Sequence, residues 1–214
     1  MKTFLAIAVL ATIQLVSAQK TTELKDFKRL TIKSGLEIQL VHGKENKLVT
    51  KDNEDGGIEV SYENNGLTLE GAGTAVLYYK NELESILAGS DAHVAGGDEI
   101  KGKTFSLNAG SDSQIALNFN VDELRVTLGS DAQIALKGTS KEMRLTAGSD
   151  CKVHTKELTA ENVTVTLGSD VEAMITAKGI VTATVGSDAQ LTIYGNPKKV
   201  NETKSGDAEI IIAK

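Results

Sequence analysis

The chain has 214 residues, a formal net charge of −6, 40% hydrophobic residues, 4% aromatic residues and no tryptophan. This length fits a single domain, and the mild acidity argues against a nucleic-acid partner, because nucleic-acid binding calls for a basic face. One proline and twenty glycines, together with so few large rings, are typical of a narrow β core filled by Val, Ile, Leu and Ala.

Residues 1–18 predict a secretory signal peptide. Lys2 precedes an apolar run from Phe4 to Val16, and Val16-Ser17-Ala18 places small residues at the −3 and −1 positions before Gln19. The apolar run is too short to span a bilayer. We therefore expect cleavage near Ala18, an extracytoplasmic location (periplasmic, cell-surface or secreted) and no membrane span.

Residues 19–87 predict a less regular β segment. Ile32, Leu36, Ile38 and Leu40 alternate with polar residues, and Ser34-Gly35 between them has the character of a shortened corner. Asn65-Gly66, between two alternating runs, predicts a tight turn between strands. We expect this segment to form the opening coils and a cap, and to be one continuous domain with residues 88–214.

Residues 88–214 carry an internal repeat. The tripeptide Gly-Ser-Asp begins at Gly89, Gly110, Gly129, Gly148, Gly168 and Gly186, and a scrambled seventh copy is Ser205-Gly206-Asp207. Copies 18 to 21 residues apart are the signature of a stacked architecture, and apolar residues alternate with polar ones on both sides of each corner. The prediction is an all-β fold, a single-stranded right-handed parallel β-helix (solenoid) with coils of roughly 19–20 residues.

Four stretches of sequence resemble one known family. They are the opening segment from Phe27 to Gly35, the strand end Gly66-Leu67-Thr68-Leu69, the serial Gly-Ser-Asp corners and the closing run Tyr194-Gly195-Asn196-Pro197. Together with the signal peptide they resemble the head GIN domain family of secreted bacterial proteins, over nearly all of the mature chain. The resemblance implies a β-helix, an extracytoplasmic location and an adhesin label, and it supplies no catalytic residues.

The corner residues suggest structural roles. Seven aspartates should form an outward row: Asp91, Asp112, Asp131, Asp150, Asp170, Asp188 and Asp207. Either each carboxylate accepts backbone N–H groups in an Asx-type turn, which we favour, or the row binds a file of calcium ions, for which the nine-residue β-roll period is missing. The corner serines fall on the inward parity and predict a stacked hydroxyl ladder.

The other reactive side chains give no site. His42, His93 and His154 lack metal-ligand spacing, and Cys151 fills a small inward slot that predicts a buried thiol. Six equivalent corner serines argue against a unique nucleophile. We therefore predict no enzyme, no catalytic, cofactor-binding or metal-ligating residue, and no cofactor.

Two columns of side chains are expected to face outward along the solenoid. One is mostly threonine, which would also suit an ice-binding face: Asn108, Thr127, Thr146, Thr166, Thr184 and Thr203. The other is small and apolar, which suggests a covered surface: Ala95, Ala116, Ala135, His154, Met174, Thr192 and Ile211.

The function that these patterns favour is a secreted or surface-exposed, non-enzymatic scaffold for adhesion or cell-envelope interaction, with an unknown surface or glycan ligand. The alternative is a carbohydrate-binding module, and less favoured are a polysaccharide-active enzyme and an ice-binding protein. A site would be expected where the repeat breaks, at Gly96-Gly97-Asp98-Glu99 and Tyr78-Tyr79-Lys80. The apolar C-terminal edge strand, Glu209 to Ile212, predicts either a homodimer or a cover from the same chain.

Overall fold

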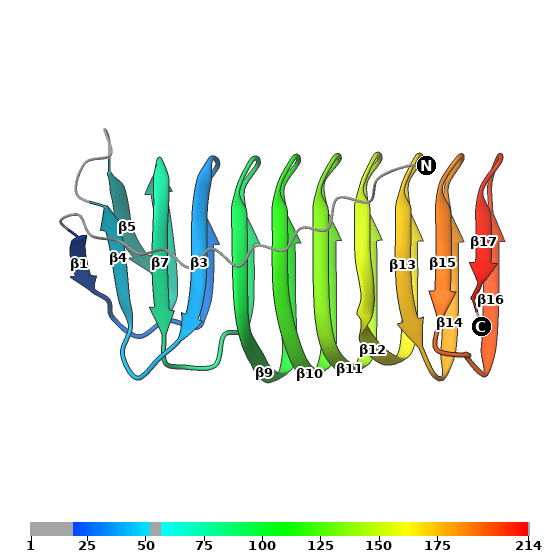
Figure 1. Cartoon of the computed structure of the whole chain (residues 1–214), viewed down its shortest axis with the longest axis horizontal. Coiled ribbons are helices and arrows are strands. Elements are labelled where there is room, and N and C mark those ends of the chain that lie inside the picture. The colour runs from blue at the N-terminus through cyan, green and yellow to red at the C-terminus, as the bar shows by residue number, and fades with distance from the viewer. Residues whose placement is uncertain (1–18, 52–56, 214) are drawn as a thin grey trace.

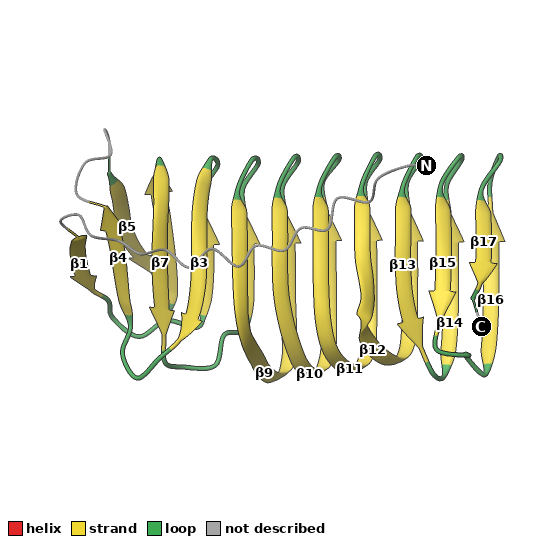
Figure 2. Cartoon of the chain, in the orientation of Figure 1, coloured by secondary structure: helices red, strands yellow, loops and turns green. Residues whose placement is uncertain are grey.

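The computed structural model describes residues 19–51 and 57–213, so the predicted signal peptide lies outside the described residues. The described chain is built of strands and turns, with no helix among these residues (Figure 2). It winds as a right-handed solenoid along one long axis, with strands stacked side by side (Figure 1). The predicted fold class is thus confirmed. Within the described ranges, no helix is available that could cross a membrane.

Each regular coil contributes to two opposed sheets, which we name face A and face B. Four long strands bend once, so that their first half lies in face A and their second half in face B: β9 (His93–Ala109), β10 (Gln114–Leu128), β11 (Gln133–Ala147) and β12 (Lys152–Leu167). The later coils are split into shorter strands: β13 (Glu172–Ala177), β15 (Gln190–Tyr194) and β17 (Glu209–Ile212) in face A, and β14 (Ile180–Val185) and β16 (Lys199–Lys204) in face B.

Equivalent residues of successive coils pair in parallel and stack into columns. Ile115 pairs with Ile134, and Leu124 pairs with Met143, so the alternation read from the sequence places every second side chain in the core. All four of these residues are at most 3% exposed. The rings of Phe105 and Phe119 pack with their centroids 5.0 Å apart, which shows that the narrow core does admit rings, at the bend of the coil.

The N-terminal coils are interleaved. β2 (Arg29–Ile32) and β3 (Leu36–His42) form one coil, β6 (Gly66–Gly71) and β7 (Gly73–Tyr79) another, and β8 (Ser85–Ala88) leads into β9. β2 pairs in parallel with both β6 and β8, and β3 pairs with both β7 and β9. The coil that comes first in the chain therefore lies second in space, between two later ones (Figure 1).

Antiparallel strands close this end of the solenoid. β4 (Lys47–Lys51) pairs with β7 and with β1 (Gln19–Glu23), while β5 (Ile58–Glu63) pairs with β6. The predicted turn between β5 and β6 is present, with positive φ at Asn64 and Asn65, which places it one residue earlier than Asn65-Gly66. Antiparallel strands cover the apolar edge that parallel coils leave open, so this end is capped.

The Gly-Ser-Asp corner is a turn whose backbone conformation explains which residue type occupies each position. Each of the six aspartates has φ between +56° and +60°, a left-handed conformation that Asp tolerates better than most residues. In three of the six corners the N–H of the residue after Asp also donates to the glycine carbonyl, as Ala92 does to Gly89 at 3.3 Å, which matches a type II turn. In the scrambled seventh corner the positive φ moves to Gly206, which explains the exchange of Ser and Gly.

Adjacent corners are bound to each other through the backbone. The N–H of Asp131 donates to the carbonyl of Ser149 in the next coil at 3.0 Å, and four other corners repeat this bond at 3.0–3.1 Å. The serine side chains do not point into the core as their parity predicted: Ser90 and Ser130 are exposed and the other four are half-buried. The turn reorients the chain between the strands, so the strand alternation does not carry through it.

The corner glycines are required by the closeness of the coils. A Cβ atom on Gly110 would lie 2.6 Å from the Ser90 nitrogen, and at all six corners the nearest atom would be 2.6–3.1 Å away. We predict that Gly110→Ala lowers the free energy of unfolding by about 2–3 kcal/mol through overpacking. Gly97→Ala is the control, since a Cβ there meets nothing within 4 Å. Urea denaturation that shows equal losses for both variants would contradict the steric explanation.

The only buried side-chain oxygen without a hydrogen-bond partner among the described residues is Ser140 Oγ. It stacks between Val121 and Ala160, so Ser140→Ala should raise the free energy of unfolding by about 1 kcal/mol. Ser113 provides the matched comparison, because its buried hydroxyl donates to the Gly110 carbonyl at 2.6 Å. Ser113→Ala should lower the stability, and urea melts of the two variants should therefore shift in opposite directions.

The conformation of the corner aspartates predicts an order of stability at Asp131. Asp131→Asn keeps a side chain suited to positive φ and removes repulsion from Asp112 and Asp150, which lie roughly 4.8 Å along the stack. It should melt higher than the parent at low salt, and the gain should vanish at about 1 M salt, where the Debye length is about 3 Å. Asp131→Ala should melt lower, because positive φ costs Ala about 1 kcal/mol or more. An alanine variant as stable as the asparagine variant would refute this account.

Candidate functional site

The interleaved coil brings the two repeat-breaking segments together at the end of β3. Residue His42 pairs with Tyr79 of β7 on one side, and Leu40 pairs with Gly96 of β9 on the other. The backbone N–H of His42 donates to the Asp98 carboxylate at 2.8 Å. Tyr78-Tyr79-Lys80 and Gly96-Gly97-Asp98-Glu99, the positions at which the sequence placed any site, therefore meet across β3.

The loop that follows β3, residues 43–46, is held in place by Asn46. This side chain is 6% exposed; its amide donates to Asp26 at 2.9 Å, and its carbonyl oxygen accepts from the Lys80 backbone N–H at 2.9 Å. Lys80 also forms an ion pair with Asp26 at 2.8 Å, and this lysine lowers the pKa of the Asp26 carboxyl. A buried, satisfied amide of this kind fixes the loop before any ligand arrives.

Two neighbouring tyrosines of β7 point to opposite faces of the strand, Tyr79 toward the core and Tyr78 away from it. Tyr79 is 4% exposed and packs against the His42 ring edge-on, with the centroids 5.3 Å apart. Burial, with a smaller contribution from the Asp98 charge, raises the pKa of Tyr79 to about 12, so the phenol stays neutral at physiological pH. Tyr78 is half-buried, and the Lys47 ammonium lies 4.9 Å from its ring centroid.

These residues surround a cavity of about 360 Å³, which we name the junction site. Its lining residues are His42, Gly43, Lys44, Glu45, Lys47 and Tyr78. The Tyr78 ring can stack on the apolar face of a ligand ring. The amine, carboxylate and imidazole groups around it can hydrogen-bond the polar substituents of that ligand. Asp98 accepts a hydrogen bond from the backbone N–H of His42, not from its imidazole. Asp98 therefore does not orient the His42 ring in the way that a carboxylate orients a histidine that acts as a general base.

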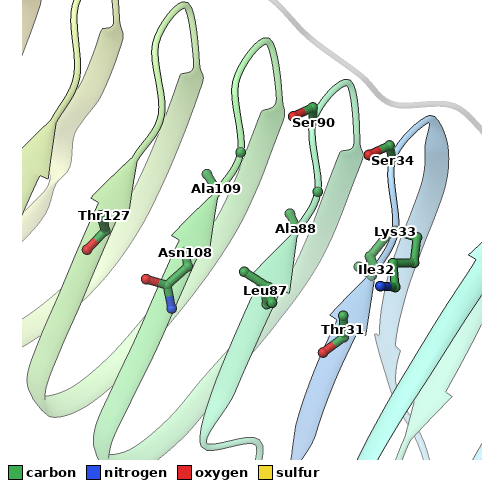
Figure 3. A pocket seen from close by; sticks show the side chains of 12 residues that line it. Thr31, Ile32, Lys33, Ser34, Leu87, Ala88, Ser90, Asn108, Ala109 and Thr127 are labelled. Atoms are coloured by element: carbon green, nitrogen blue, oxygen red, sulfur yellow. The ribbon is translucent and has the colours of Figure 1, made fainter.

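A second hollow, of about 400 Å³, lies on face B beside the corners (Figure 3). Its lining includes Thr31, Leu87, Asn108 and Thr127, which stand on neighbouring strands in the threonine column. Leu87 is 49% exposed there. Leu87 and Asn108 interrupt the hydroxyl array toward the N-terminal end, which weakens the ice-binding interpretation.

The remaining candidate residues do not converge. His93 and His154 are exposed on different columns of face A. Cys151 is buried as predicted, with its Sγ 2.9 Å from the Gly129 carbonyl, and burial raises the pKa of its thiol. The corner aspartates are exposed in a row, and across residues 19–51 and 57–213 no group of three or more His, Cys, Asp or Glu side chains is placed to hold a metal ion.

Sequence reasoning missed His42 and the loop at residues 43–46. The sequence treats His42 as an ordinary surface residue, and it is indeed exposed. Its position beside Tyr79 depends on the insertion of β3 between β7 and β9. No local pattern signals that insertion, because β3 alternates like any other strand of the solenoid.

Comparison with solved structures shows the same fold. A crystal structure titled as a putative adhesin (BF0245) from Bacteroides fragilis NCTC 9343 superposes with a TM-score of 0.82 at 15% identity, covering 90% of this chain and 95% of that one. Two further putative adhesins are from Parabacteroides distasonis ATCC 8503 (TM-score 0.69, 12% identity, 91% and 96% covered) and Parabacteroides merdae ATCC 43184 (TM-score 0.64, 16% identity, 92% and 96% covered).

No curated protein sequence matches the chain. A family model does match, over residues 26–197, and its description is "Putative auto-transporter adhesin, head GIN domain". The match includes the interleaved coils, the junction site and all six regular corners. Since it spans well over half of the sequence, the protein belongs to the head GIN domain family.

Proposed function

We propose that this protein is an extracytoplasmic, non-enzymatic scaffold that mediates adhesion through surface side chains. The observation that carries the proposal is the repetition of the exposed faces: pairs such as Ala116 and Ala135, or Thr127 and Thr146, place like residues side by side in successive coils. A repeating face binds an extended or repeating partner over many equivalent contacts. A hydrolase of the β-helix type needs one unrepeated acid–base cluster instead.

The family and the predicted signal peptide support the proposed extracytoplasmic location. The family description names an auto-transporter adhesin head, and Val16-Ser17-Ala18 provides the cleavage motif. We propose cleavage near Ala18, which N-terminal sequencing of the exported protein tests. We further propose that residues 19–213 act as one domain, because the two faces share one continuous core.

A specific observation favours carbohydrate as the ligand class. The junction site combines the half-buried ring of Tyr78 with His42, Glu45 and Lys47 around one cavity. Sugars present an apolar face of C–H groups, which stacks on aromatic rings, and a rim of hydroxyls, which bonds charged and polar side chains. The anchored loop at residues 43–46 reduces the ordering cost of binding.

The carbohydrate prediction is tested with a glycan array and one matched pair of variants. Tyr78→Ala should reduce the affinity for any bound glycan by about tenfold or more, because truncation of a tyrosine that anchors a ligand costs roughly 1–2 kcal/mol or more. Tyr194→Ala is the control: Tyr194 is also half-buried, lies on the same face and has the Lys156 ammonium 4.3 Å from its ring centroid. It should bind like the parent.

Two outcomes separate the candidate functions. Saturable glycan binding that Tyr78→Ala abolishes and Tyr194→Ala leaves intact supports the junction site. Saturable retention of the labelled protein on cell or mucin surfaces, unchanged by Tyr78→Ala, supports the scaffold function through the repeating faces and contradicts the carbohydrate assignment. An absence of saturable binding to glycans, cells and protein-coated surfaces alike would contradict both.

A further inference from the structure

The last described coil, β16 and β17, leaves the core open. Ile210 pairs in register with Leu191 and Ile212 pairs with Ile193, and both partners are fully buried. Ile212 nevertheless remains 54% exposed, because none of the described residues covers it. The family match ends at residue 197, so this coil also lies outside the matched segment.

The backbone at this edge offers free hydrogen-bonding groups in a defined register. The N–H groups of Lys199 and Ser205 donate to carbonyls at the two ends of the preceding face B segment, those of Gly179 and Val185. The N–H groups of Glu209 and Ala213 likewise donate to the carbonyls of Ala189 and Ile193 on face A. Since successive residues of a strand point their backbone groups to opposite sides, the even-numbered residues direct their N–H and C=O groups to the open edge. These are Val200, Glu202 and Lys204 in β16, and Ile210 and Ile212 in β17.

Two charged side chains stand where the core columns reach this edge. Glu202 pairs with Ala183, and Lys204 pairs with Val185; both partners are buried. Glu202 and Lys204 therefore lie on the inward side of the strand, and they are exposed because no described coil covers them. Inward charges usually protect an edge from pairing. Here the two have opposite signs and are two residues apart.

We propose that the protein forms a homodimer in which two such edges meet in antiparallel fashion around a two-fold axis. On face B the axis passes through Thr203, which places Glu202 of each copy opposite Lys204 of the other. On face A the same axis passes through Ile210, because the corner closed by the bond from Ala208 N–H to the Ser205 carbonyl sets Thr203 and Ile210 at equal height. One axis therefore satisfies both faces.

This register also matches the hydrogen-bonding groups. Opposite residues of an antiparallel pair that exchange bonds must both point to the shared edge, and the arrangement places Glu202 against Lys204 and Ile210 against Ile210. The even-numbered residues thus meet each other on both faces. The two sheets and the apolar core would run continuously from one copy into the next.

The contributions to binding are distinct. Burial of Ile210 and Ile212 and pairing of the backbone edge supply affinity. The two Glu202–Lys204 pairs lose solvent on association, so their net effect on affinity is small, but they select the register and exclude alternatives that would leave a charge unpaired. A self-complementary patch of this kind is the requirement for a two-fold interface.

The charge pairing can be tested by the loss of dimerisation in single charge variants and by its recovery when the two variants are mixed. Sedimentation of the purified protein should show a dimer at micromolar concentration. Glu202→Lys places two positive charges on each side of the axis and Lys204→Glu places two negative charges there, so each variant alone should dimerise about tenfold more weakly or worse. An equimolar mixture of the two variants should form a heterodimer with parent-like affinity, since every pair is again of opposite sign.

A cross-link tests the position of the axis. In the proposed dimer, Thr203 of one molecule lies opposite Thr203 of the other as a non-hydrogen-bonded pair, the arrangement in which Cβ atoms come closest. Thr203→Cys in a Cys151→Ala background should therefore form an intermolecular disulfide under mild oxidation. Thr184→Cys, one coil inside on the same exposed column, is the control and should remain monomeric in non-reducing gels.

Several outcomes would overturn the proposal. A monomeric parent would refute it, as would single charge variants that dimerise like the parent, or a Thr184→Cys cross-link as efficient as the one at Thr203. Failure of the mixed variants to associate, with both folded by circular dichroism, would refute the register.

Discussion

The spacing between coils at the Gly-Ser-Asp corner constrains the rest of the molecule. Each corner glycine packs directly on the backbone of the preceding corner, where a Cβ atom would be 2.6–3.1 Å from its neighbour. This contact aligns the strands in register, and the in-register strands bring like residues into columns. The buried core, the exposed faces and the open edge of the last coil all inherit their regularity from it.

The regular part of the fold was predictable because local and global signals agree there. The alternation around Gly129-Ser130-Asp131 specifies which side chains are buried, and the repeat spacing specifies which of them stack. The predicted side-chain direction was wrong at one position in each corner. Strand alternation predicted that the serines point inward, but the positive φ of the following aspartate reorients the chain. A periodic rule holds only while the backbone stays extended.

The junction site could be located but not assembled from sequence. Tyr78 and Gly96 stood out because the repeat breaks there, and this break has no structural explanation within a single coil. Their proximity depends on β3, which lies between β7 and β9, and strand order is decided by long-range pairing among segments with the same alternation. His42 carried no signal for that reason, since its importance comes entirely from its neighbours.

The interleaved first coil imposes an order on folding as the chain emerges. Strands β2 and β3 have all of their parallel partners later in the chain, so a polypeptide that emerges N-terminus first during synthesis cannot complete this coil until its residues as far as Gly96 have followed. Closing such long loops is slow compared with adding one coil to a finished stack. The capped end would then nucleate the solenoid, and the repeats would assemble on it in the order in which they emerge.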